Sequence, residues 1–177
     1  MALFTGGAGS GNRRLMRDLA RLGHDFTPEQ TLIGQTARDF ATRQLAPAAH
    51  ERDRTGRYPL EHVGQLAELG LLAMKVSADD GGAGTDNVGY LLAMEAIAER
   101  CASTAVVLAS SNLASKILAD HASVAQKERW LRPYAAGRLG TASFALSEPG
   151  CGSDAASITT TPSGPTMTPE LGSPSAV

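Results

Sequence analysis

Two long segments with very little charge follow each other in the middle of the sequence. Residues 88–100 are almost wholly apolar, with Glu95 and Glu99 near their end, and residues 104–119 carry little charge before Lys116. A helix that is apolar around most of its circumference is normally buried in a soluble protein. We therefore expect these two segments to form the centre of a helical bundle, around which the other segments pack.

A strong helix start precedes this pair. Thr27 and Gln30 have the spacing of a capping box, and Pro28 suits the first position of a helix. We expect this helix to end at Pro47 and the polar stretch after it. Its apolar positions share one helical face: Leu32, Ile33, Ala37, Phe40, Ala41 and Leu45.

Further helices are predicted on both sides of the apolar pair. One covers residues 59–69, with Gly70 as its left-handed cap. Ser123 and Gln126 form another capping box, which begins a more polar helix that ends near residues 133–137.

The segments between and after the helices differ in character. Residues 78–86 are a loop by composition, rich in Gly and Asp. Residues 141–147 are short, apolar and bounded by Gly140 and Pro149, which favours a strand. A lone strand leaves its backbone groups unpaired, so we expect a sheet to begin there. The predicted organisation is a flexible extension (1–25), a helical domain (26–139), the start of a β-domain (140–161) and a Pro-, Ser- and Thr-rich tail that reads as disordered (162–177).

Composition excludes several classes of function. The net charge of -2 and the pI near 6.1 argue against a nucleic-acid-binding surface. No run approaches the roughly 18 apolar residues of a membrane span. Cys101 and Cys151 lie far apart, and the four histidines show no ligand spacing, so no metal site is predicted. Cys101 is expected to be a buried small hydrophobe. We expect a reducing compartment and a cytoplasmic location.

The stretch "FALSEPGCGSDAAS" places turn-forming residues and hydrogen-bond donors directly after the predicted strand. Gly150 and Gly152 allow positive φ and a close approach of the backbone to another molecule. Ser147 and Ser153 add hydroxyl groups, and Asp154 is suited to cap the turn. Such a turn fits a planar, oxygen-rich cofactor or a phosphate. A plain surface turn with an Asp cap explains the same residues equally well.

This stretch resembles the flavin-contacting signature of the acyl-CoA dehydrogenase family. The matching positions are Ala145, Leu146, Ser147, Glu148, Gly152, Ser153, Asp154 and Ser157. Cys151 departs mildly from the small residue that is usual there. Weaker similarity upstream extends the resemblance over residues 26–161, including "TPEQTLIGQTARDF" and "LGLLAMKVSADDGGAG". The implied fold class is mainly α: the N-terminal helical bundle of this family, followed by the first strand of an incomplete β-domain.

The resemblance also implies a cofactor, a substrate and a partner. Ser147 would contact the isoalloxazine ring of FAD, and Ser153 would also face the acyl-CoA substrate. The family oxidises acyl-CoA thioesters and passes electrons to an electron-transferring flavoprotein. The residues implied to line FAD are Phe144, Ala145, Leu146, Ser147, Glu148, Pro149, Gly150, Cys151, Gly152 and Ser153.

Two parts of the family pattern are missing from the sequence, namely the second flavin-contacting patch and the catalytic glutamate. We assign no catalytic residue, because Glu95, Glu99 and Glu148 lie in the wrong regions. The chain is therefore expected to be a fragment that is inactive alone, and a frameshift after Thr161 is one hypothesis for its tail. The family's homo-oligomeric state is not expected to carry over. Two alternatives stay open: an acyl-CoA oxidase or other flavoenzyme of this fold, and a non-catalytic helical module that binds a partner.

Overall fold

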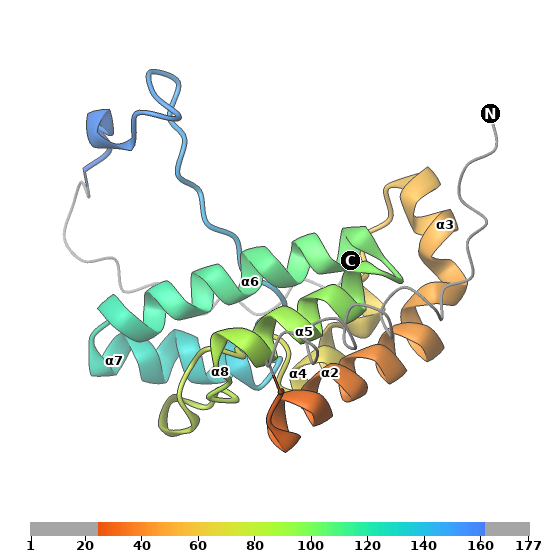
Figure 1. Cartoon of the computed structure of the whole chain (residues 1–177). Coiled ribbons are helices and arrows are strands. Elements are labelled where there is room, and N and C mark those ends of the chain that lie inside the picture. Colours follow the sequence, from red (N-terminus) through yellow and green to blue (C-terminus); the bar gives the residue numbers. More distant parts are fainter. Residues whose placement is uncertain (1–24, 162–177) are drawn as a thin grey trace. The chain divides into compact units, whose positions relative to one another are not determined.

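The computed structural model describes residues 25–161, which divide into two compact units between Phe144 and Ala145. The predicted N-terminal extension up to residue 24 and the predicted tail from residue 162 lie outside the described residues. The first unit is helical (Figure 1). Its elements are α2 (Pro28–Phe40), η1 (Ala41–Leu45), α3 (Ala46–Thr55), η2 (Leu60–His62), α4 (Val63–Glu68), η3 (Ala78–Asp80), α5 (Asn87–Ala98), α6 (Ala102–His121), α7 (Val124–Gln126), η4 (Lys127–Leu131) and α8 (Arg132–Ala135).

The two helix starts predicted from capping boxes are confirmed, whereas the helix predicted from residue 59 begins as the short turn η2 and becomes α-helical at Val63. The Thr27 hydroxyl accepts a hydrogen bond from the backbone N–H of Gln30, and the Gln30 side chain accepts one from the backbone N–H of Thr27. Ser123 and Gln126 form the same reciprocal pair at the start of α7. Local hydrogen bonds of this kind satisfy the first N–H groups of a helix and make its start readable from sequence.

The prediction that the first helix ends at Pro47 is wrong, because the helix continues through η1 and α3 to Thr55. Proline lacks an N–H, and its ring clashes with the carbonyl four residues before it. Here a wider π-helical turn, η1, directly precedes the proline, and the backbone N–H of Ala46 bonds to the carbonyl of Ala41. Pro133 follows η4 in the same way, so both prolines are accommodated without a break.

Glycines end two of the helices, at α4 as predicted and again after α8. At the end of α4, Gly70 has a φ of 72° and donates to the carbonyl of Ala67, while Leu71 donates to the carbonyl of Leu66. Gly137 has a φ of 74° and ends α8 with the same pair of bonds. This is the Schellman arrangement, whose left-handed residue is usually glycine.

The two apolar segments form α5 and α6, as predicted, and α2 packs mainly against α5 (Figure 1). The prediction that α5 and α6 are buried on most sides is wrong. Leu91, Val106 and Leu113 are exposed, and only one face of each helix enters the core. Apolar composition does not reveal whether a second layer covers the outer face. The core contains residues from every helix-rich part of the unit: Ala37, Phe40, Leu45, Leu66, Leu72, Met74, Val76, Ile97, Leu108, Leu131 and Tyr134.

Among residues 25–161, α6 is long and apolar enough, by its 20 residues and composition alone, to cross a membrane. A core helix passes the same test. Its buried face carries polar side chains that point into the bundle: Thr104, Ser111, Asn112 and Ser115. A third of the apolar window of α6 is buried in the unit.

The non-helical run of residues 71–76 lies inside the core, where each backbone group needs a partner. Asn112, only 3% exposed, accepts from the N–H of Met74 (2.8 Å) and donates to the carbonyls of Leu71 (2.8 Å) and Leu108 (3.0 Å). The Tyr134 hydroxyl donates to the carbonyl of Leu72 (3.1 Å). Side chains of α6 and α8 thus replace the backbone pairing that a helix or sheet would supply.

The loop at residues 78–86, predicted from composition, completes this pairing. The N–H groups of Ala83, Gly84 and Thr85 donate to the carbonyls of residues 73, 76 and 74, at 2.7 to 3.1 Å. Asp86 then caps α5 by accepting from the N–H of Gly89 (2.7 Å).

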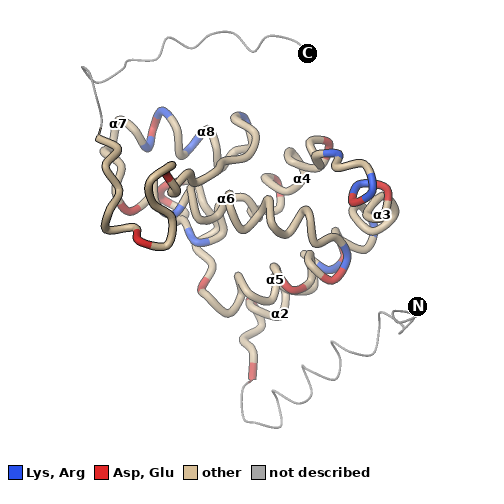
Figure 2. The backbone as a smooth tube through the Cα atoms, turned by 90° about the horizontal axis from the view of Figure 1, so that it is seen from above, with Lys and Arg blue, Asp and Glu red and all other residues tan. Residues whose placement is uncertain are grey.

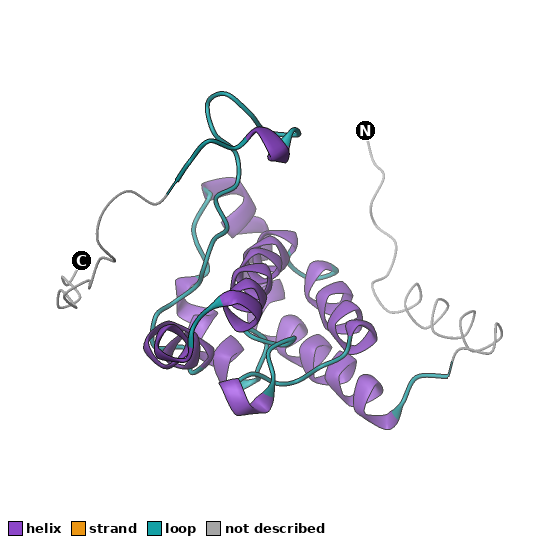
Figure 3. Ribbon diagram, turned by 90° about the vertical axis from the view of Figure 1, so that its left-hand side faces the viewer, coloured by secondary structure: helices purple, strands orange, loops and turns teal. Residues whose placement is uncertain are grey.

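The strand predicted over residues 141–147 is not formed. Figure 3 shows helices and loops, and the single β-pairing in the described part of the chain is a bridge between Glu148 and Cys151. A strand needs a second strand to pair with, and residues 141–144 are held by side chains instead. The carbonyl of Ala142 accepts from the hydroxyls of Ser110 (3.4 Å) and Ser111 (3.5 Å).

We predict that Asn112→Ala lowers the free energy of unfolding by about 3 kcal/mol, because it strands the buried N–H of Met74 and the carbonyl of Leu71. The matched control is Asn87→Ala, at an exposed position, which should change it by less than about 0.5 kcal/mol. Urea denaturation measures both variants. Equal effects would contradict the role given to Asn112.

A second prediction compares two glycines. A Cβ on Gly82 would lie 2.2 Å from the carbonyl oxygen of Val76, so Gly82→Ala should destabilise the fold by more than about 2 kcal/mol. A Cβ on Gly64, within α4, would meet no atom within 4 Å. Gly64→Ala should therefore stabilise the fold by up to about 1 kcal/mol. Thermal unfolding of the two variants should shift in opposite directions, and shifts of one sign would refute the comparison.

Candidate functional site

The second unit begins with the predicted flavin-contacting stretch, which forms a tight turn. Glu148 and Cys151 exchange backbone hydrogen bonds of 2.9 and 3.2 Å. Pro149 and Gly150 occupy the two central positions, and proline favours the first of these because its φ is already suitable. The turn therefore follows directly from the "SEPGC" sequence.

Gly150 and Gly152 do not adopt the positive φ that glycine allows, since neither lies among the glycines with left-handed backbone. The turn is closed without it. A Cβ on Gly150 would meet no atom within 4 Å, and one on Gly152 would meet only the Ser147 hydroxyl oxygen, at 3.8 Å. Nothing within residues 25–161 therefore requires glycine at these two positions, and both leave the backbone open to a close approach from outside.

The carboxylate of Glu148 holds the far end of this loop. It accepts hydrogen bonds from the N–H of Thr160 (2.7 Å), the N–H of Thr159 (3.0 Å) and the hydroxyl of Thr159 (3.1 Å). Hydrogen bonds from Thr160 and Thr159 lower the pKa of Glu148 from 4.5 to about 2. Glu148 was predicted to line FAD, and that stays a prediction; in the structure its carboxylate accepts hydrogen bonds within the loop. Sequence reasoning missed Thr159 and Thr160, whose hydroxyls alone mark no site.

The remaining predicted residues, apart from Cys151, are open to solvent. Ser147 and Ser153 are exposed, and neither side chain makes a hydrogen bond in the described part of the chain. Phe144, the last residue of the first unit, and Leu146 in the second are exposed apolar side chains. Asp154 precedes the short turn η5 (Ala155–Ser157) and accepts from the Ser157 hydroxyl. Cys151 is half-buried.

These residues fit a planar cofactor. Apolar side chains such as Leu146 can pack on a ring face, and the unpaired hydroxyls of Ser147 and Ser153 can bond to polar ring atoms. The open faces of Gly150 and Gly152 allow backbone N–H groups to approach the same molecule. The chemistry of the loop is binding and orientation, because the lowered pKa of Glu148 makes its carboxylate a weak base.

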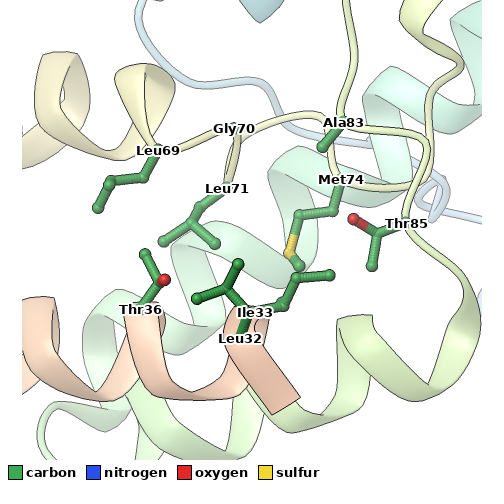
Figure 4. Close-up of a pocket in the computed structure, with 9 residues that line it drawn as sticks. All are labelled: Leu32, Ile33, Thr36, Leu69, Gly70, Leu71, Met74, Ala83 and Thr85. Carbon is green, nitrogen blue, oxygen red and sulfur yellow. The ribbon is translucent and has the colours of Figure 1, made fainter. Parts of the chain in front are cut away.

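The first unit has a cavity of about 160 Å³ that the sequence did not indicate (Figure 4). Side chains of α2 face those of the turn after α4 across it, and it is lined by Leu32, Ile33, Thr36, Leu69, Gly70, Leu71, Met74, Ala83 and Thr85. Its lining carries no charged side chain, so it offers no acid or base. Gly70 and Ala83 are the small residues whose positions leave this space open.

Several charged residues of the first unit form ion pairs. Figure 2 shows Lys, Arg, Asp and Glu concentrated on α3 and along α7 and α8, with few on α6. Glu99 pairs with Arg38 at 2.7 Å, which accounts for one of the acidic residues at the end of α5. Within residues 25–161 there is no group of three His, Cys, Asp or Glu side chains that could hold a metal ion.

Comparison with known proteins identifies the family of the helical unit. Residues 27–138 match the acyl-CoA dehydrogenase N-terminal domain. The chain is 42% identical over 132 residues to the mitochondrial short-chain specific acyl-CoA dehydrogenase of Sus scrofa. The matched region covers 73% of this chain and 32% of the relative. The chain thus spans about a third of the length of such relatives.

Solved structures agree in fold. A glutaryl-CoA dehydrogenase from Mycobacterium smegmatis in complex with FADH2 matches with a TM-score of 0.72 and 26% identity, covering 80% of this chain and 36% of the other. A chain from a structure described as the electron transferring flavoprotein of Acidaminococcus fermentans matches with a TM-score of 0.69 and 28% identity, covering 75% and 35%. With its helical unit matched by the family's N-terminal domain, this chain belongs to the acyl-CoA dehydrogenase family.

Proposed function

We propose that this chain supplies the N-terminal helical domain and a flavin-contacting loop of a FAD-dependent enzyme that introduces the α,β double bond of an acyl-CoA thioester. The observation that carries the proposal is the loop at residues 145–153. Its hydroxyls and glycine faces have no role within the described residues, and it follows a helical unit that matches this family.

The chain's own residues bind and orient. Ser147 offers its hydroxyl to the flavin ring, and Ser153 offers a second hydroxyl on the side of the acyl-CoA. Glu148 acts indirectly, since its carboxylate fixes Thr159 and Thr160 and so holds the loop in shape. Bound FAD would supply the acceptor for the hydride that leaves the β-carbon of the thioester.

The rest of the reaction is proposed to depend on further residues. The chain spans about a third of its relatives' length, and Glu95, Glu99 and Glu148 are not assigned as the base that removes the α-proton. We propose that the 177-residue chain alone has no dehydrogenase activity. The name of the Sus scrofa relative favours a short-chain acyl-CoA substrate and a dehydrogenase over an oxidase. The match to a structure described as an electron transferring flavoprotein favours such a flavoprotein as acceptor. The cytoplasmic location stays a prediction.

Amide chemical shifts of the chain test the flavin loop. We predict that FMN, which carries the isoalloxazine ring, shifts the signals of residues 145–153, whereas ADP does not. Ser147→Ala should weaken the FMN response by up to about tenfold, the value of one hydrogen bond. The control is Ser143→Ala, at an exposed position just before the loop, which should leave it unchanged. Shifts confined to α2–α8, or equal responses to FMN and ADP, would argue against the proposal.

The acid titration of Glu148 tests its positioning role. The folded pKa of about 2 lies below the ordinary 4.5, so the closed loop is stabilised fully above about pH 4.5 and loses that stabilisation as the pH falls towards 2. The carboxyl carbon of Glu148 and the amides of Thr159 and Thr160 should therefore titrate together near pH 2. In Glu148→Gln the two amide signals should no longer titrate. A midpoint near 4.5 would show that the three groups do not interact.

A further inference from the structure

Arg52 is a buried cation on α3. It is only 3% exposed, and its guanidinium points toward the start of α6 and toward η2. One terminal nitrogen donates to the Cys101 sulfur at 3.4 Å, and the other donates to Glu61 at 3.5 Å. Its Nε has no hydrogen-bond partner within residues 25–161. A buried charge is costly unless it is compensated, so the identity of its counter-charge matters.

Glu61 is not a dedicated counter-charge. Its carboxylate is 37% exposed and is shared with Arg57 at 3.7 Å and with His62 at 3.8 Å. A partly exposed carboxylate divided among three basic groups, at a long distance from each, compensates a buried guanidinium poorly.

Cys101 is the other group that Arg52 contacts. It is 4% exposed and occupies the N-cap position of α6, a 20-residue helix. The Thr104 hydroxyl donates to its sulfur at 3.2 Å, in addition to Arg52. Burial raises the pKa of Cys101, but hydrogen bonds from Thr104 and Arg52 outweigh it and leave that pKa below the ordinary value. Cys101 is thus buried as predicted, but it is not a simple hydrophobe, because its sulfur accepts hydrogen bonds from two polar side chains.

The elements around Cys101 contribute further charged and titratable groups. On the α3 side Glu51 lines a small cavity beside Arg52, and on the α5 side Arg100 precedes Cys101 in sequence. Glu99 is paired with Arg38 at 2.7 Å and lies 3.9 Å from Arg100. The charged and titratable groups on the elements around Cys101 are therefore Arg38, Glu51, Arg52, Arg57, Glu61, His62, Glu99 and Arg100.

We propose that Cys101 is a thiolate at neutral pH and is the buried counter-charge of Arg52, joining α3 to the N-terminus of α6. Three independent features favour the anion: the guanidinium, the Thr104 hydroxyl and the positive end of a long helix. On folding, the thiol proton passes to solvent and the sulfur keeps the electron pair of the S–H bond. The resulting thiolate accepts hydrogen bonds from Arg52 and Thr104. The bundle thereby contains an ionic joint that is sensitive to pH.

Ultraviolet absorption tests the ionisation, because a thiolate absorbs where a thiol does not. The full chain carrying Cys151→Ser has Cys101 as its single sulfhydryl. At neutral pH its spectrum, minus that of the Cys101→Ser, Cys151→Ser chain, should show thiolate absorbance that disappears on unfolding in urea, where the pKa returns to about 8.5. A difference that emerges only above about pH 8.5 in the folded chain would overturn the proposal.

Variants of Arg52 separate charge from packing. Arg52→Gln should raise the midpoint of the thiolate absorbance by at least about one pH unit, whereas Arg52→Lys, which keeps the charge, should raise it less. Arg54→Gln is the matched control on the exposed side of α3 and should leave the midpoint unchanged. Equal midpoints for Arg52→Gln and Arg54→Gln would refute the pairing.

Stability provides a measurement that does not require the Arg52 variants to fold. A pKa lowered by folding stabilises the native chain fully above the unfolded value of about 8.5, and this contribution is lost as the pH falls through the folded pKa. The destabilisation caused by Cys101→Ser in the Cys151→Ser chain should therefore grow as the pH rises across the neutral range. A destabilisation that is constant with pH would show that Cys101 is neutral.

Discussion

The helical unit depends on satisfying the backbone of one irregular segment that lies in its core. Residues 71–76 are buried without forming a helix or a strand, so their N–H and carbonyl groups need partners from elsewhere. Asn112 and Tyr134 supply some of these partners, and the backbone N–H groups of residues 83–85 supply three more. The positions of α6, α8 and the glycine-rich loop all follow from this requirement.

This constraint explains the unusual distribution of side chains on α6. Apart from Leu108, the face that enters the core is lined by small or polar residues such as Ser111 and Asn112. The apolar residues Val106 and Leu113 lie on the exposed side. At the start of the same helix, Cys101 lies against Arg52, so α6 is held by polar contacts at more than one point along its length.

Local sequence signals predicted much of the helical unit. The capping boxes at Thr27 and Ser123 and the glycine end at Gly70 involve residues within a few positions of each other, so they are visible in sequence. The prediction that the helix ends at Pro47 was wrong because it depended on more than local sequence. Whether a proline ends a helix depends on whether the preceding turn widens, and packing of the helix decides that. The predicted strand at residues 141–147 depended on a distant partner strand, which local sequence does not provide.

The sequence by itself determined the family, the helix starts and the turn of the flavin-contacting loop, because each rests on residues close together in the chain. Only the tertiary structure decided which polar groups meet inside the protein. Asn112 lies far along the chain from Leu71, and Cys101 far from Arg52. Glu148 and Thr160 meet only when their loop closes. Such pairs leave no pattern in sequence, because hydrogen bonds and charge compensation depend on distance in space.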